Sequence, residues 1–169
     1  MSGKENQRRG KTQEYRLKAA LEKMDGVEII KYYGQREGGA GDFLVQVGRR
    51  RVRFDHKSTK DDTVIRLQRK WLEKLVGENM LRMDEEGTAI PVISFTIGGK
   101  RGIYVMTKKI LGAPQIDPQQ ILGIHTKLKS CPITGGMLND YGVIQISFSN
   151  YAVYIYTLQF FIARVKEHG

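Results

Sequence analysis

The sequence predicts an α/β fold, because helical and strand-like segments alternate along the chain. Apolar residues recur every three to four positions in 12–25 and again in 63–76, which is the period of amphipathic helices. Two short alternating runs meet at Gly48-Arg49 and indicate a β-hairpin, because glycine at the first central position suits a two-residue turn. Further strand-like runs are rich in β-branched and aromatic residues: 27–33, 90–97, 103–106, 143–148 and 151–156.

The N-terminal region combines a basic arm with an unusual helix. Residues 1–11 are polar and basic, and we expect them to form a flexible arm. In the helix that follows, Glu14 falls on the same stripe as Leu17 and Leu21, where a glutamate is unexpected. Glu14 either has a functional role or complements the dipole of the first helical turn.

The hairpin carries the main candidate site. Its register places Asp42 directly opposite Asp55 on the polar face, with Lys57 next along that face. Directly opposed residues have Cβ atoms only ~5 Å apart, and two carboxylates at that distance repel each other unless a cation or a proton lies between them. The pattern predicts a divalent-metal site beside a lysine; the alternative is a solvent-facing polar face with a weak ion pair. His56 alternates onto the apolar face, where we expect its side chain to be structural. That face holds the pairs Phe43/Phe54 and Val45/Val52.

The remaining elements follow from the same rules. The helix at 63–76 carries Gln68 at the centre of its apolar stripe. Burying an unpaired amide costs roughly 2 kcal/mol or more, so Gln68 needs a partner, either on the hairpin or on the backbone. We expect a short helix at 118–122, a loop at 127–141 and a helix at 158–167.

Composition restricts the class of protein. A chain of 169 residues that is 40% hydrophobic can form one domain with a real core. Its net charge of +10 favours a polyanionic partner, although a merely soluble basic protein has the same balance. The single cysteine, Cys131, excludes an intramolecular disulfide and favours a reducing compartment. No apolar run approaches the ~20 residues of a membrane span, and the N-terminus lacks the apolar region of a secretory signal, so we expect a cytoplasmic protein.

The order helix, strand, hairpin, helix, strand, strand, with acidic residues at these positions, resembles the PD-(D/E)xK nuclease superfamily, and within it the archaeal-type Holliday junction resolvases. The motifs that carry the resemblance are Arg8-Arg9-Gly10-Lys11-Thr12-Gln13-Glu14, Gly41-Asp42, Asp55-His56-Lys57-Ser58 and Leu67-Gln68-Arg69-Lys70-Trp71-Leu72. The likeness covers roughly residues 8–110. The chain departs from the pattern at Gly41, where the motif usually has proline, and at Asp55, where glutamate is more common.

The resemblance implies a restriction-endonuclease-like core (α-β-β-β-α-β-β, with a mixed central sheet flanked by helices) and a C-terminal extension. On this basis the chain divides into a flexible basic arm at 1–11, a nuclease core at 12–110 and an extension at 111–169. We expect the extension to pack on the core or to lie at a dimer interface.

The resemblance also implies a catalytic set and a metal: Glu14, Asp42, Asp55, Lys57 and Gln68, with Mg²⁺ as cofactor and Mn²⁺ able to substitute. Asp42 and Asp55 would be direct ligands and the backbone carbonyl of His56 a third, while Glu14 would bind a second metal or a metal-bound water. Lys57 would orient the attacking water and stabilise the transition state, and Gln68 would position Lys57 or that water.

The expected partner is DNA, held through its phosphates by basic residues: Arg8, Arg9, Lys11, Arg49, Arg50, Arg51 and Arg53. The resemblance implies a resolvase that cuts four-way or otherwise branched DNA in recombination and repair, and that works as a homodimer because a junction has two symmetric scissile strands. Two alternatives stay open. One is a restriction-type or nicking endonuclease acting on duplex DNA, and the other is a non-catalytic nucleic-acid-binding module.

Overall fold

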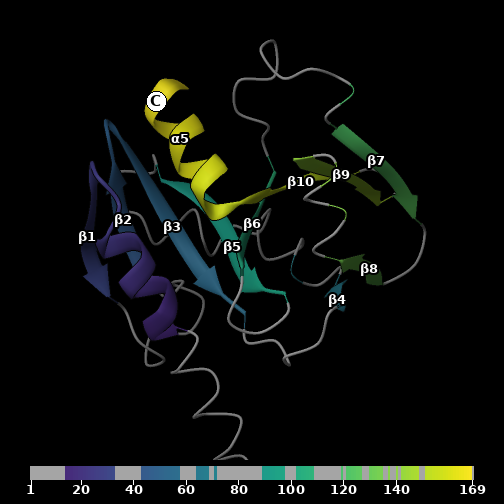
Figure 1. Ribbon diagram of the computed structural model, residues 1–169, viewed down its shortest axis with the longest axis horizontal. Coiled ribbons are helices and arrows are strands. Elements are labelled where there is room, and N and C mark those ends of the chain that lie inside the picture. Colours follow the sequence, from purple (N-terminus) through teal and green to yellow (C-terminus); the bar gives the residue numbers. More distant parts are fainter. Residues whose placement is uncertain are drawn as a thin grey trace, which may run out of the picture.

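A mixed sheet of eight strands forms the centre of the computed structural model, in the order β1-β2-β3-β5-β6-β10-β9-β7 (Figure 1). The strands are β1 (Val27–Tyr32), β2 (Phe43–Val47), β3 (Arg50–His56), β5 (Ile90–Thr96), β6 (Ile103–Thr107), β7 (Ile121–Thr126), β9 (Val143–Phe148) and β10 (Tyr151–Thr157). A separate two-stranded sheet pairs β4 (Val64–Gln68) with β8 (Ser130–Thr134). The structure describes residues 14–32, 43–57, 64–68, 71, 89–97, 102–108, 119, 121–126, 130–134, 137, 140, 142–148 and 151–168.

Strand directions make the sheet mixed, as the resemblance implies. The first three strands form an antiparallel meander. β5 then joins β3 in parallel and β6 in antiparallel orientation, and β7 runs parallel to β9. A parallel neighbour needs a crossover connection rather than a tight turn. The chain between β3 and β5 provides such a crossover, because the two strands are neighbours although β4 lies between them in sequence.

Two helices cover one face of this sheet, namely residues 14–22 and α5 (Leu158–His168) (Figure 1). Leu17 and Leu21 of the first helix are fully buried, as their spacing predicts, and pack in one cluster with Phe54 and with Phe161 of α5. The rings of Phe54 and Phe161 meet edge to face at 6.4 Å. This cluster fixes which side of β3 is the apolar side.

The small sheet contributes to the cluster on the opposite face. Leu67 of β4 and Ile133 of β8 are buried together with Ile93 and Phe95 of β5. Successive residues of β5 therefore go to opposite clusters, with Val92 on the helix side and Ile93 on the other. A strand buried on both faces has a nearly continuous apolar sequence, which explains the run at 90–97.

The C-terminal segment belongs to the same sheet. β10 pairs with β9 on one side and with β6 on the other. The helix that follows it places Phe161, Ile162 and Val165 in the cluster on the helix side of the sheet. No helix in the described part of the chain is both long and apolar enough to cross a membrane.

Three sequence predictions of secondary structure are wrong in the described residues. The predicted helix at 63–76 begins instead with strand β4, although Trp71 is helical. The predicted loop at 127–141 contains β8, and the predicted short helix at 118–122 runs into strand β7. In the first two cases the two segments pair with each other, residue 64 opposite 134 and residue 68 opposite 130. A short apolar run is compatible with the period of a helix and with that of a strand, and here the long-range pairing selects the strand.

Candidate active site on strand β3

The β2–β3 hairpin has the predicted register. Phe43 pairs with Phe54, Val45 with Val52, and the described pairing continues to Val47 and Arg50 at the turn. Gly48 has a φ of +57°, which is the left-handed conformation that a primed two-residue turn demands at its first central position. The polar and apolar faces of the hairpin are therefore those expected. Asp42, the next residue in this register, lies outside the described residues.

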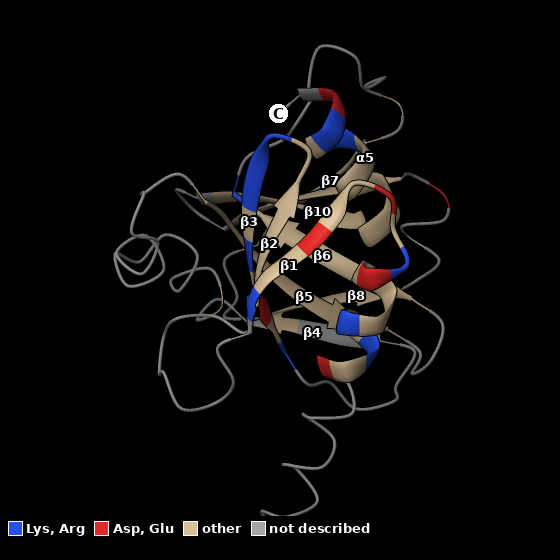
Figure 2. Cartoon of the chain, turned by 90° about the vertical axis from the view of Figure 1, so that its left-hand side faces the viewer, with Lys and Arg blue, Asp and Glu red and all other residues tan. Residues whose placement is uncertain are grey.

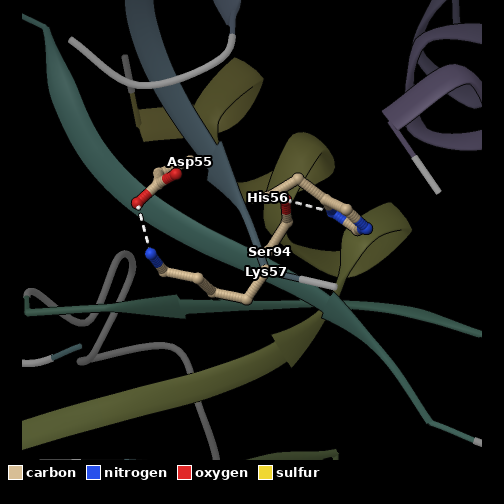
Figure 3. A network of polar contacts seen from close by, with 4 residues as sticks. All are labelled: Asp55, His56, Lys57 and Ser94. Atoms are coloured by element: carbon tan, nitrogen blue, oxygen red, sulfur yellow. Dashed lines mark hydrogen bonds and ion pairs between the residues drawn. The ribbon is translucent and has the colours of Figure 1, made fainter. Parts of the chain in front are cut away.

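Asp55 and Lys57 form an ion pair at the C-terminal end of β3 (Figure 3). Lys57 Nζ lies 3.2 Å from Asp55 Oδ2, and the side chains are 27% and 8% exposed respectively. The backbone N–H of Lys57 donates to the carbonyl oxygen of Ser94 at 2.8 Å, which ties this end of the chain to β5. A nearly buried carboxylate beside a partly exposed ammonium group can offer a hard oxygen ligand and a positive charge at one point of the surface.

His56 lies on the other face of the strand, as the register predicts. Its Nδ1 and the hydroxyl of Ser94 are 2.8 Å apart, and Figure 3 shows this pair pointing away from Asp55 and Lys57. Burial lowers the pKa of His56 from 6.5 to about 4, and the negative charge of Asp55 only partly offsets this effect. The imidazole is therefore neutral at neutral pH, which fits a structural side chain.

Glu14 is buried on the helix that covers the opposite face from Asp55. The residue is 7% exposed and lies in the first described turn, three residues before Leu17. Val52 and Phe54 share a cluster with this helix, so the alternating Asp55 belongs to the other side of β3. Within the described residues, no three His, Cys, Asp or Glu side chains come together as a metal-binding group.

The other predicted site residues fall in two groups. Arg8, Arg9, Lys11 and Asp42 lie outside the described residues. Gln68 is described only in its backbone, where it ends β4 opposite Ser130. Its predicted place at the centre of a helical stripe is wrong, because residues 64–68 form a strand.

The hairpin arginines differ in accessibility. Arg53 is 1% exposed and lies two residues before Asp55 on the same face, so its predicted contact with DNA phosphate is not possible in this structure. Its neighbours across the sheet are Leu44 and Pro91. A fully buried guanidinium contributes to the internal charge balance of the strand rather than to a surface.

A basic surface remains at the turn (Figure 2). Arg49 is exposed there, and Arg50 and Arg51 are half-buried. Lys166 of α5 lies close to the turn, because a Cβ added to Gly48 would be 3.9 Å from the Cα of Lys166. Arg50 and Asp55 are five residues apart on one strand, which corresponds to ~17 Å. Lys166 was missed in the sequence because nothing local links α5 to the hairpin. The other missed residue, Ser94, could have been found as a hydroxyl inside an apolar strand.

Comparison of the chain with protein-family models, with curated proteins and with solved structures finds no match.

Proposed function

We propose that the protein is a metal-dependent DNA endonuclease with a restriction-endonuclease-like core, and that its substrate is a branched DNA such as a four-way junction. The observation that carries this proposal is the Asp55–Lys57 pair, 3.2 Å apart, at the end of a strand whose register follows the predicted hairpin. The antiparallel meander β1–β3 with β5 parallel to β3, and the helix over one face, support such a core. β4 stands where the pattern has a helix and is a departure from it.

The donor chemistry fits a hard divalent cation, because Asp55 supplies a nearly buried carboxylate at the end of β3. In the proposal Asp42, Asp55 and the backbone carbonyl of His56 would hold Mg²⁺, or Mn²⁺ in its place, whereas Glu14, whose helix covers the other face of β3, has no part in this site. The ion supplies charge neutralisation at the phosphate and lowers the pKa of a bound water.

The protein's own groups have distinct tasks in this mechanism. Asp55 would hold and orient the metal ion, and the neighbouring Lys57 would contact the phosphate and stabilise the charge that develops on it. Gln68 is assigned to positioning Lys57 or the attacking water. Phosphates farther along the strand contact the basic surface of Arg49, Arg50, Arg51 and Lys166, with the basic arm (Arg8, Arg9, Lys11) as a further contact. Two symmetric scissile strands imply a homodimer.

The test is cleavage of a labelled synthetic four-way junction and of a linear duplex with the same sequences, with Mg²⁺ and with EDTA. Wild type, Asp55→Asn and Asp140→Asn are compared, because Asp140 is an exposed carboxylate away from the hairpin and controls for lost surface charge. Paired symmetric nicks in the junction that require Mg²⁺ and are lost only in Asp55→Asn are the expected result.

Other outcomes separate the alternatives. Equal cutting of the duplex, still lost in Asp55→Asn, moves the function to a restriction-type or nicking enzyme. Salt-sensitive binding of both substrates without any cutting leaves a nucleic-acid-binding module and overturns the catalytic roles.

A further inference from the structure

A cavity of about 480 Å³ opens on the helix side of the sheet, between the N-terminal helix, the end of β5 and the start of β6. Its volume lies within the usual range for sites that hold small organic ligands. The helix contributes Arg16, Ala19 and Ala20, and the turn directly after it contributes Lys23; the four residues recur at the spacing of a single helical stripe. This stripe lies beside the one that carries Leu17 and Leu21 into the core.

The charges around the cavity indicate an anionic ligand. Arg16 lies in the helix and Lys23 directly after its end, seven residues apart, which corresponds to ~10 Å along the continued helix axis. Among the described residues that line the cavity none is acidic. Two cations at opposite ends can hold two separate anionic groups on one ligand.

The walls between these cations are mostly apolar. Ala19 and Ala20 of the helix, Met24 just after it and Ile103 of β6 line the cavity, and the small alanine side chains leave space open. Polar groups come from Thr96 at the end of β5 and Gln159 in the first turn of α5. A ligand that matches this arrangement has a flat ring system with a few hydrogen-bonding groups and a phosphate on either side. One nucleotide within a DNA strand has this structure.

The cavity and the candidate active site lie at the same edge of the sheet. Ser94, which contacts both His56 and the backbone of Lys57, is two residues before Thr96 on β5, or ~7 Å along the strand. This edge holds the carboxyl ends of the parallel strands β3 and β5, where ligands of α/β sheets commonly bind. A single strand that passes over the edge can reach the cavity on one face and Asp55 on the other.

We propose that this cavity receives one unpaired nucleotide of the DNA substrate, an inference that rests on the proposed nuclease function. Arg16 and Lys23 bind the phosphates on either side of that nucleotide, and the apolar walls contact the base. Continuous duplex cannot supply an unstacked nucleotide without paying for its extrusion, whereas a branch point can. The cavity thereby gives the enzyme a preference for branched over fully paired DNA.

The first test measures binding of dAMP, deoxyadenosine and inorganic phosphate to the full chain by NMR. We expect dAMP to bind with shifts at Ala19, Ala20 and Thr96, and the nucleoside and phosphate to bind at least ~10-fold more weakly, since each lacks one part of the recognition. Ala19→Phe fills the cavity from an exposed helix position, and Arg16→Gln removes a cation; each should weaken dAMP ~10-fold or more.

The control is Lys18→Gln, which removes a charge from the same helix at a residue that does not line the cavity and pairs with Glu22 at 3.8 Å. It should leave dAMP binding unchanged. Equal binding of phosphate and dAMP, or loss of binding in Lys18→Gln as much as in Arg16→Gln, would show a general anion surface and overturn the inference.

The second test compares binding of Asp55→Asn protein, in EDTA, to a duplex with one unpaired nucleotide and to the fully paired duplex. Ala19→Phe should abolish the preference for the unpaired nucleotide. If wild type cuts junctions but neither dAMP binding nor this preference depends on Ala19, the inference alone fails. If dAMP binds as described and no DNA is cut, the nuclease proposal fails and the nucleotide site stands.

Discussion

Neighbouring residues at the end of β3 are buried to almost the same extent on opposite faces of the strand, and they are accommodated in different ways. Asp55 is 6% exposed and His56 is 7% exposed. The carboxylate has an ammonium group at 3.2 Å, so its charge is matched inside the protein. The imidazole has a hydroxyl at 2.8 Å and gives up its charge instead, with a pKa lowered to about 4.

The difference separates a charged group that can bind a metal ion or a phosphate from a neutral group that cannot. A charge held by a partly exposed lysine can be shared with a metal ion or a phosphate when the lysine shifts its contact. The imidazole on the helix side of the sheet is neutral and carries no charge that it could share with a metal ion or a phosphate. We therefore place function on the Asp55 face and packing on the His56 face, and each prediction below tests one side of that contrast.

The largest expected effect is on cleavage in Lys57→Met. The substitution keeps most of the side-chain volume and removes the positive charge beside Asp55. Loss of one preorganised charge at a phosphate should lower the cleavage rate by roughly 10²–10³-fold. Single-turnover cleavage of the junction in saturating Mg²⁺ measures this effect.

Lys108→Met is the matched control, because Lys108 is exposed just after β6. It should cut at the wild-type rate. If Lys57→Met retains its fold by circular dichroism and also cuts normally, the Asp55–Lys57 pair is only structural and the contrast between the two faces disappears.

The second prediction concerns His56 and pH. Above pH 6.5 the imidazole is neutral in both folded and unfolded chains, so it contributes no pH dependence. Between pH 6.5 and about 4 the unfolded chain takes up a proton that the folded chain does not, so the free energy of unfolding falls as pH falls. The total loss from this residue is roughly 3 kcal/mol.

His56→Asn keeps a hydrogen-bonding group near Ser94 and cannot titrate. Urea unfolding of both proteins between pH 7 and pH 4 should show a steeper loss for wild type. Parallel curves over that range would mean that the imidazole is protonated in the folded protein and is not the neutral packing residue described above.

The hairpin could be predicted from sequence because its information is local. A glycine with positive φ between alternating runs defines the turn, and the turn then fixes every pair along the ladder, including the faces of Asp55 and His56. The helix stripe of Leu17 and Leu21 is local in the same sense. These elements needed no knowledge of their tertiary neighbours.

The wrong predictions concern segments whose structure depends on residues far away in the sequence. Residues 64–68 form a strand because residues 130–134 pair with them, more than sixty positions away. β8 itself contains Pro132, which argues against a strand except at an edge, and among the described strands β8 pairs with β4 alone. Arg53 was assigned to phosphate because charge usually lies outside; its burial depends on layers that only the folded chain brings together.

The smallest predicted effect tests the hydroxyl that supports His56. Ser94→Ala removes the Oγ that lies 2.8 Å from His56 Nδ1, and should lower the free energy of unfolding by roughly 1–2 kcal/mol because a buried ring nitrogen loses its partner. Cleavage should change less than about twofold, since Oγ lies on the face opposite to Asp55 and the backbone carbonyl that accepts from Lys57 is retained. Ser147→Ala, a half-buried serine in β9, controls for the propensity of the substitution in a strand. A large loss of cleavage in Ser94→Ala with little loss of stability would reverse the assignment, because His56 would then act on the chemistry through the strand rather than support its packing.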